Sequence, residues 1–335
     1  VKIKSTKSGP LPVTRGVIQG SIIGPLLFLI VINDLASLST NGRMILYADD
    51  GVLLQSHERH SSIETPIIDD MSKVLRLLDD RKLTINSSKT VFMVFHSPFK
   101  SPVIPLTIKI NNSFLLSKVN TFKYLGLWLD SSLNFEIHCQ HVERKIIPAV
   151  YSLWKLQKLI PLKQRLAMFN ALIMSYLQYL IVCWGTATHK AIDKLQILQN
   201  RGLRNVFKHE PRSNREYMYR AHEVLPISAL CYFRTAIFVH SAINNFVHTP
   251  IKFEISNARR RTQYLNPTQS TNNYGIKCIT CMGPRMFNLL PNEIKLCLKQ
   301  TEFKKKLSVY LISPEQLPKF FKKRFLDITS LYTVT

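Results

Sequence analysis

The sequence predicts an α+β fold in which small antiparallel sheets and helices come first and helices alone follow. Up to about residue 133, short apolar segments are separated by turn signals such as Asn111-Asn112. From about Asn134 onward, apolar residues recur at helical spacing over much longer segments. From this change of period, and from a weaker helical pattern after Pro211, we expect domains at residues 1–133, 134–210 and 211–335.

The first part is expected to open with a glycine turn, a helix and a hairpin. Gly16–Ser21 favours a tight turn, and Gly24-Pro25 opens an apolar helix that ends near Asn33-Asp34, since proline is favoured at the first helical position. Because its residues are apolar on all sides, we expect this helix to be buried. Two strands, RMILY and GVLLQ, are expected around Asp49-Asp50-Gly51.

Further along, the pattern predicts one amphipathic helix and several short strands. Apolar residues between Ser62 and Leu83 recur at helical spacing, with charges on the other face. The segment LTINSSKTVFMVF predicts a strand, an Asn-Ser-Ser turn and a second strand. After a proline-rich loop, TIKI and FKYLGLWLD predict further strands.

The second part is expected to be helical. Helices are predicted over 138–156, 162–184 and 191–207, with breaks at Pro161 and Gly185. Further helices are predicted near Ile227–Asn245 and Pro291–Leu311. The apolar segments 22–32 and 171–184 are too short to span a bilayer.

Composition indicates a folded protein with a polyanionic partner. Of the 335 residues, 46% are hydrophobic and 20% are charged, which excludes a disordered composition. Of the formal net charge of +24, residues 1–100 contribute +3, from 12 Lys+Arg and 9 Asp+Glu, and residues 101–335 contribute +21, from 33 and 12. A field of this sign favours nucleic acid over a membrane as partner. The basic side chains singled out in the second part are Lys194, Arg201, Arg204, Arg212, Arg215, Arg220 and Arg259-Arg260-Arg261.

The cysteines indicate neither a disulfide framework nor a zinc site. All six are scattered and no signal peptide precedes them, so we expect a reducing intracellular compartment. A nuclear destination is consistent with the sequence, which carries no clear signal for it. Cys278-x-x-Cys281 and His138-Cys139-x-His141 each have half of a zinc spacing, and because zinc needs four ligands we expect no metal there.

The segment ILYADDGVLL places two adjacent carboxylates, Asp49 and Asp50, between two apolar runs. One interpretation is a solvated Asp-Gly hairpin turn. The other is a site for a hard divalent cation, which prefers carboxylate oxygens and allows two neighbouring acids to ionise together. The pattern by itself leaves both interpretations open.

The order of the motifs resembles one known family. The segment GVIQGSIIGPLLFLIVINDL, followed by MILYADDGVLL, is similar to the palm of the reverse transcriptases of non-LTR (LINE-type) retrotransposons with jockey-like members. LTINSSKTVFMVF resembles the Asn-x-x-Lys-Thr segment of that family, and FKYLGLWLD resembles its Tyr-Leu-Gly hairpin. LQILQNRGLRNV and MFNLLPNEIKLCLKQTEFKKKLSVYL are similar to its thumb and post-thumb regions. The resemblance implies a partial palm over 1–133, a helical thumb over 134–210 and a basic post-thumb region over 211–335.

The resemblance also implies an RNA-directed DNA polymerase that uses two Mg²⁺ ions. Asp49 and Asp50 would bind the metal, with Asp49 as the direct ligand. Gln19, Gly20 and Ser21 would lie beside the incoming deoxynucleotide and the template, although the loop could also simply cap the following helix. The family usually has proline where Ile18 stands.

Two further turns have implied roles. Lys89 would donate a proton to the leaving pyrophosphate or relieve its charge, and the alternative is a plain surface lysine. Tyr124, Leu125 and Gly126 would place a backbone turn against the end of the DNA primer, and the alternative is an ordinary hairpin. The implied partners are an RNA template, a DNA primer, the RNA–DNA duplex and deoxynucleoside triphosphates.

One required group is missing from the sequence. A palm of this family needs a third carboxylate before the glycine turn, and no Asp or Glu precedes Asp34. We therefore expect a C-terminal piece of such a polymerase that binds Mg²⁺ weakly and does not synthesise DNA by itself. The alternatives are a catalytically dead nucleic-acid-binding relic of a retroelement and a group II intron maturase-like protein, which fits the helical second half less well.

Overall fold

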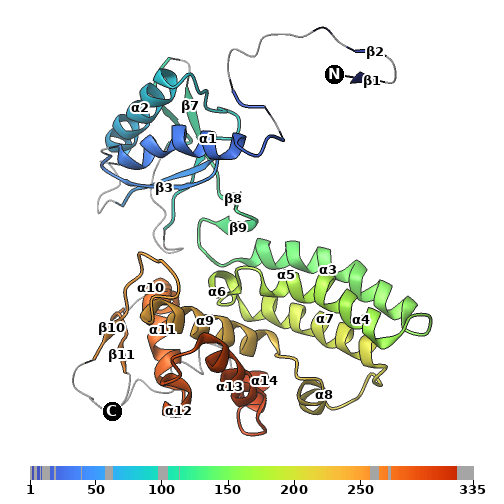
Figure 1. Cartoon of the computed structure of the whole chain (residues 1–335). Coiled ribbons are helices and arrows are strands. Elements are labelled where there is room, and N and C mark those ends of the chain that lie inside the picture. The colour runs from blue at the N-terminus through green and yellow to red at the C-terminus, as the bar shows by residue number, and fades with distance from the viewer. Residues whose placement is uncertain are drawn as a thin grey trace. The chain divides into compact units, whose positions relative to one another are not determined.

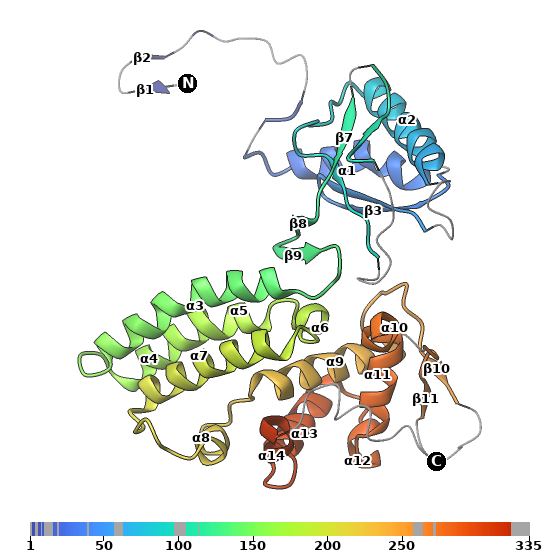
Figure 2. The same cartoon turned by 180° about the vertical axis from the view of Figure 1, so that it is seen from behind.

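The computed structural model in Figure 1 and Figure 2 shows a mixture of helices and small sheets, which confirms the predicted α+β fold class. The structure describes residues 2–3, 6–7, 9, 16–18, 20–38, 40–56, 63–96, 105–112, 114–256, 264–270 and 273–322. The chain divides into two compact units, Val1–Phe122 and Lys123–Thr335. Each unit is described by itself below, and the division into three domains stays a prediction.

The first unit contains short strands and two helices. Its elements are β1 (Lys2–Ile3), β2 (Thr6–Lys7), α1 (Gly24–Ile32), the 3₁₀ turn η1 (Asn33–Ser37), β3 (Arg43–Tyr47), β4 (Asp50–Leu54), α2 (Glu64–Asp80), β5 (Val91–Phe92), β6 (Thr107–Lys109) and β7 (Leu115–Lys118). β3 and β4 form an antiparallel hairpin, as do β1 and β2. β7 lies between β5, to which it is parallel, and β6, to which it is antiparallel.

The apolar face of α2 organises the core of this unit. Met71 packs with Ile108, Phe114 and Leu116 in one buried cluster. Val74 and Leu78, one and two turns further along, pack with Leu35 and with partly buried residues of β3 in a second cluster. The predicted amphipathic helix is therefore confirmed, and it joins the hairpin side of the unit to the three-stranded sheet.

The prediction that α1 is buried is wrong. Of its residues only Gly24 is buried, while Leu26 is 58% exposed and Ile30 is 61% exposed. Apolar residues surround the helix, but the described elements of the unit cover only the side near Ile32, which packs against the cluster of Leu35. A helix that is apolar on all sides needs neighbours on all sides, and these neighbours are absent from the described residues.

The strand predicted before the Asn-Ser-Ser turn is also wrong. Residues 83–86 have no regular structure, and the strand after the turn is limited to β5. The end of α2 explains the difference, because the backbone N–H of Leu83 donates to the carbonyl of Leu78 at 2.8 Å across the left-handed Lys82 (φ +56°). This closing turn uses the donor that a strand would need.

The second unit is a helical assembly that begins within the hairpin strand β8. Its elements are β8 (Thr121–Tyr124), β9 (Leu127–Asp130), α3 (Glu136–Leu156), α4 (Leu162–Phe169), the π-helical turn η3 (Asn170–Met174), α5 (Ser175–Gln178), α6 (Ile181–Trp184), α7 (His189–Phe207), α8 (Arg215–Ala221), α9 (Ile227–Ile243), β10 (Glu254–Ile255), β11 (Leu265–Asn266), α10 (Asn273–Lys277), α11 (Ile279–Asn288), α12 (Asn292–Lys295), α13 (Gln300–Ile312) and α14 (Leu317–Lys322).

One continuous apolar core holds this unit together. α3, α4 and α7 lie side by side, and α9 packs against α11 and α13 (Figure 1, Figure 2). Gly202 allows the close approach of α7, because a Cβ there would lie 2.8 Å from Ile173 of η3. No helix within the described ranges combines the length and apolarity needed to cross a bilayer.

Two predicted helices are interrupted. The helix predicted over 162–184 breaks at Leu180 (φ +50°), where the indole N–H of buried Trp184 donates to the Tyr179 carbonyl at 2.7 Å. This bond satisfies a carbonyl that the broken helix leaves open, so neither Pro nor Gly is needed for the break. The region from Pro291 to Leu311 forms two helices, α12 and α13, while the helices predicted over 138–156, 191–207 and near 227–245 are confirmed as α3, α7 and α9.

Candidate functional site

The two adjacent acids lie at the tip of the β3–β4 hairpin. The strands pair in the register Leu46↔Gly51 and Tyr47↔Asp50, which leaves Ala48 and Asp49 as a two-residue turn. Ala48 adopts a left-handed conformation (φ +52°). Asp50 therefore belongs to the strand, whereas the sequence pattern predicted that the second strand begins at Gly51.

Both carboxylates are available for a ligand. Asp49 and Asp50 are exposed, and neither carboxylate has a hydrogen-bond or ion-pair partner within the described part of the chain. The next pair down the hairpin, Leu46 and Gly51, brings Leu46 to the cluster of Leu35. The tip is thus held on an apolar base while its acids face solvent.

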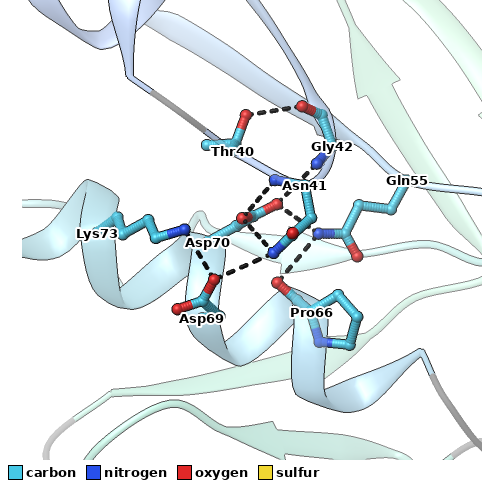
Figure 3. Close-up of polar contacts among 8 residues, drawn as sticks. All are labelled: Thr40, Asn41, Gly42, Gln55, Pro66, Asp69, Asp70 and Lys73. Carbon is cyan, nitrogen blue, oxygen red and sulfur yellow. Dashed lines mark hydrogen bonds and ion pairs between the residues drawn. The ribbon is translucent and has the colours of Figure 1, made fainter.

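The open end of the same hairpin is fixed by a buried acid of α2, as Figure 3 shows. Asp70 is 0% exposed, and one of its oxygens accepts hydrogen bonds from the backbone N–H of Asn41 at 2.8 Å and from its side-chain amide at 3.1 Å. The other oxygen accepts from the backbone N–H of Gly42 at 2.9 Å and from the side-chain amide of Gln55 at 2.6 Å. We call Asn41, Gly42, Gln55 and Asp70 the hairpin clamp. It ties the residues just before β3 and just after β4 to α2.

Contacts around the hairpin clamp add to its rigidity. The Gln55 amide also donates to the Pro66 carbonyl at 3.1 Å (Figure 3). Gly42 must be glycine, because a Cβ there would lie 2.6 Å from the Leu54 carbonyl oxygen. Exposed Asp69 pairs with Lys73 at 2.8 Å, and the hydrogen bond from Lys73 lowers the pKa of Asp69.

The sequence contained a signal for Asp70 that periodicity alone passes over. Position 70 lies three residues after Ile67 and four before Val74, so it falls on the apolar face of α2. A buried acid on such a face needs hydrogen-bond donors, and these donors must come from another element that packs against the helix. Reading Asp69 and Asp70 together as solvent-facing charge misses this.

The glycine loop is described at Gly20 and Ser21, while Gln19 lies outside the described residues. Gly20 has φ +85°, a conformation that favours glycine. The Ser21 hydroxyl accepts a hydrogen bond at 3.0 Å from the backbone N–H of Gly24, the first residue of α1. Capping of the following helix is therefore a role that Ser21 performs in this structure.

Lys89 lies on a turn that Asn86 organises. The Asn86 side-chain oxygen accepts hydrogen bonds from the backbone N–H of Ser88 at 3.1 Å and of Lys89 at 3.2 Å. The Asn86 carbonyl accepts from the Thr90 backbone N–H at 3.1 Å and from its hydroxyl at 2.9 Å. Lys89 is exposed, and its ammonium group has no ion-pair partner among the described residues. The Asn and Thr of this motif thus shape the turn and leave the lysine free.

The Tyr124-Leu125-Gly126 segment forms a tight turn between β8 and β9 in the second unit. Leu125 (φ +45°) and Gly126 (φ +83°) are both left-handed. The hydroxyl of Tyr179 donates to the Leu125 carbonyl at 2.6 Å, and a Cβ on Gly126 would lie 3.1 Å from the Tyr179 ring. Tyr179, at the helix break described above, was not singled out from the sequence, and it fixes this turn on the helical assembly.

The half-zinc spacings gather no further ligands. Among the described residues, no three His, Cys, Asp or Glu side chains lie close enough to hold a metal ion. Cys139 is buried, and this burial raises the pKa of its thiol to about 12. Cys281 is fully buried while Cys278 is exposed.

The basic residues of the second unit are mostly at the surface. Arg204 is partly buried, and Arg259-Arg260-Arg261 lies outside the described residues. The exposed residues among those singled out from the sequence are Lys194, Arg201, Arg212, Arg215 and Arg220. These side chains therefore contribute to a positive surface, as the charge distribution indicates.

Comparisons with known proteins agree on one family. Residues 2–129 match the model of the reverse transcriptase (RNA-dependent DNA polymerase) family. The chain is 26% identical over 217 residues to the probable RNA-directed DNA polymerase from transposon BS of Drosophila melanogaster. This alignment covers 62% of this chain and 24% of that protein. It is 26% identical over 212 residues to the RNA-directed DNA polymerase from mobile element jockey of Drosophila funebris, covering 58% and 22%.

A third relative gives a similar alignment. The probable RNA-directed DNA polymerase from transposon X-element of Drosophila melanogaster is 27% identical over 212 residues, covering 61% of this chain and 23% of that protein. The chain thus spans about a quarter of the length of the curated relatives it matches. No solved structure is significantly similar to it.

Proposed function

Since the chain carries a reverse transcriptase domain similar to those of non-LTR retrotransposons, we propose that it forms part of an RNA-directed DNA polymerase of such an element. The reaction would extend a DNA primer on an RNA template with deoxynucleoside triphosphates. One observation carries this proposal: Asp49 and Asp50 are adjacent and exposed at the tip of a hairpin within the matched range, and their carboxylates have no partner among the described residues.

The two acids fit a magnesium site in the chemistry of their donors. Mg²⁺ is a hard cation that takes carboxylate oxygens and keeps several waters. Asp49 and Asp50 would hold it, with Asp49 as the direct ligand. When bound, Mg²⁺ supplies charge stabilisation to the attacking 3′-oxygen and the leaving pyrophosphate.

The other residues to which the resemblance assigns a role would position the substrates or neutralise their charge. The hairpin clamp around Asp70 ties the open end of the acid-bearing hairpin to α2. Gly20 lets the backbone approach a nucleotide closely. The free ammonium group of Lys89 would stabilise the negative charge of the leaving pyrophosphate or donate a proton to it. The turn at Leu125 and Gly126 would support the primer end.

We further propose that this chain alone does not synthesise DNA. A two-metal site needs more oxygen ligands than two acids supply, because hydrated Mg²⁺ releases its waters reluctantly. No Asp or Glu precedes Asp34, and no third ligand joins the pair within the described ranges. Metal binding at Asp49 and Asp50 is therefore expected to be weak.

Titration with Mn²⁺, followed by electron paramagnetic resonance, tests the metal site. We expect weak binding that is lost in Asp49→Asn and retained in Asp69→Asn, which removes one exposed acid from the same unit. Equal binding by both variants would contradict the site. In a primer-extension assay with Mg²⁺, we expect no product from the chain, and synthesis that depends on Asp49 would contradict the proposed inactivity.

A catalytically dead nucleic-acid-binding relic of a retroelement is the second candidate, because the net charge of +21 in residues 101–335 favours nucleic-acid binding whether or not the hairpin binds a metal. This alternative keeps the basic second unit as the functional surface. It predicts binding to nucleic acid that is unchanged by Asp49→Asn, together with no Mn²⁺ binding at the hairpin. The same titration therefore separates the two functions.

A further inference from the structure

From Arg144 onward, the exposed surface of α3 and of α4 carries positive charge without any acid, whereas the first turns of α3 carry Glu136 and Glu143. Residues 144–192 contain seven Lys+Arg and no Asp or Glu. One of the seven, Arg165, is buried, and its guanidinium donates to the carbonyls of Val206 at 2.8 Å and Ile160 at 3.0 Å, so it serves the fold. The other six are exposed: Arg144, Lys145, Lys155, Lys158, Lys163 and Lys190.

Two exposed aromatic rings lie within this positive surface. Tyr151 is 53% exposed and Trp154 is 54% exposed, and they are three residues apart on α3. Their ring centroids are 5.8 Å apart, and the ammonium group of Lys155 lies 4.9 Å from the Tyr151 centroid. Two neighbouring aromatic rings that are more than half exposed beside cations are typical of surfaces that bind a partner.

The helix that presents these rings is held rigidly from its other side. Val150 and Leu153 of α3 are buried in the core, and the Asn205 side chain of α7 donates to the Val150 carbonyl at 3.0 Å. Within the second unit, α7 and α4 lie along the inner side of α3 and β9 contacts its first turns, while Tyr151 and Trp154 further along stay more than half exposed (Figure 1, Figure 2). The rings are therefore presented by a fixed helix.

We propose that this aromatic–basic face, made of Arg144, Lys145, Tyr151, Trp154, Lys155 and Lys158, binds an unpaired stretch of nucleic acid. Bases stack on the rings of Trp154 and Tyr151, and the cations contact the phosphates. Stacking requires an open base face, which a duplex covers with neighbouring pairs, so the face prefers single strands. The identity of the strand as RNA rests on the proposed function.

Fluorescence of Trp154 provides a direct test. The chain has three tryptophans, and Trp184 is fully buried while Trp128 is partly buried. Titration with a short oligouridylate should quench the emission of Trp154, because a stacked base quenches indole fluorescence. In Trp154→Phe the quenching should disappear, while binding, measured by anisotropy of a labelled oligouridylate, should be largely retained.

Two substitutions separate stacking from charge. Trp154→Ala should weaken oligouridylate binding about tenfold without changing the dependence of log K on log salt, since it removes a stacking platform and no cation. Lys155→Gln should reduce the slope of that dependence by about 0.7. An unchanged affinity for Trp154→Ala would overturn the proposal.

A matched control comes from another basic helix. Tyr217 of α8 is 58% exposed, close to the value for Tyr151, so Tyr217→Ala should leave binding unchanged while Tyr151→Ala weakens it. Equal losses would overturn the proposal, as would tighter binding of a hairpin duplex than of oligouridylate. Binding to anionic phosphatidylserine vesicles that depends on Trp154, without quenching by oligouridylate, would instead assign the face to a membrane surface.

Failure of this inference and failure of the proposed function are distinguishable. Mn²⁺ binding at Asp49 concerns the first unit, and quenching of Trp154 concerns the second. If Mn²⁺ does not bind at Asp49 but oligouridylate still quenches Trp154, the chain is a nucleic-acid-binding protein without a metal site. Circular dichroism of each variant excludes unfolding as the cause of lost binding, since all substituted side chains in the face are exposed.

Discussion

The carboxylate of Asp70 accepts a hydrogen bond from the backbone N–H of Gly42 at 2.9 Å, which joins the buried side of α2 to the start of β3. Twenty-eight residues separate the two in sequence. The acids of the candidate site lie at the far end of the same hairpin, so their position depends on a residue that touches neither of them.

Asp70→Ala should destabilise the first unit. The substitution leaves the backbone N–H groups of Asn41 and Gly42 and the Gln55 amide without their acceptor, at a cost of about 2–4 kcal/mol in the free energy of unfolding. Chemical denaturation measures this change. Asp69→Ala, which removes an exposed ion pair with Lys73 and an exposed hydrogen bond from the Asn41 amide, should have a much smaller effect, and equal effects of the two variants would contradict the importance of the hairpin clamp.

Gly126→Ala should destabilise the turn between β8 and β9. The new Cβ would be strained at φ +83° and would press on the Tyr179 ring, at a combined cost of about 1–3 kcal/mol. The melting temperature should fall accordingly. Gly51→Ala is the matched control, because a Cβ there meets only Leu46 at 3.4 Å without a positive φ. A melting temperature that falls more for Gly51→Ala would count against this account of the turn.

His138 should make the second unit sensitive to acid. The residue is 3% exposed, and its imidazole lies beside Trp184 and accepts a hydrogen bond from the backbone N–H of Trp128 at 3.4 Å. Burial, and to a smaller extent the charge of His141, lowers the pKa of His138 to about 4. The unfolded chain takes up this proton near pH 6.5, whereas the folded chain does so only near pH 4. The stability that depends on a neutral His138 is therefore complete above about pH 6.5 and is lost as the pH falls toward about 4.

The expected loss is about 3 kcal/mol in the free energy of unfolding across that range. His138→Asn keeps a side-chain acceptor for the Trp128 N–H and does not titrate. The difference in unfolding free energy between the parent chain and this variant, measured from pH 7 to pH 4, should shrink as the pH falls. A constant difference would show that His138 is not the titrating group.

Binding to an RNA–DNA duplex should weaken steeply with salt. The net charge of +21 in residues 101–335 predicts several phosphate contacts, and each releases a counterion. The logarithm of the affinity should fall linearly with the logarithm of the salt concentration, as measured by fluorescence anisotropy. A nearly flat response would contradict both the polymerase and the relic as functions of this chain.

Local patterns predict the hairpin and the long helices well, because each depends on signals within a short segment. The apolar runs around Asp49 and Asp50 fix β3 and β4, and helical spacing fixes α2, α3 and α7. The glycine of FKYLGLWLD likewise marks the turn at Gly126. These elements form where sequence and local geometry favour the same structure.

Long-range contacts account for what the patterns miss. The break at Leu180 is an exception, because the Trp184 indole donates to the Tyr179 carbonyl only five residues away, and helical spacing does not indicate this bond. Asp70 finds donors 28 and 29 residues earlier in the chain, beyond any periodicity. The exposure of α1 also depends on distant residues. The hydrophobicity of a helix predicts that burial would be favourable, but it does not predict whether other elements pack against the helix.

The uncovered leucines and isoleucines of α1 bear directly on how the protein behaves in a test tube. Water in contact with a stripe of this kind is released when two stripes meet, so concentrated solutions should favour self-association. Sedimentation profiles would then shift with loading concentration, and mild detergent would reverse the shift. Measurements of affinity and melting are therefore best made on dilute samples.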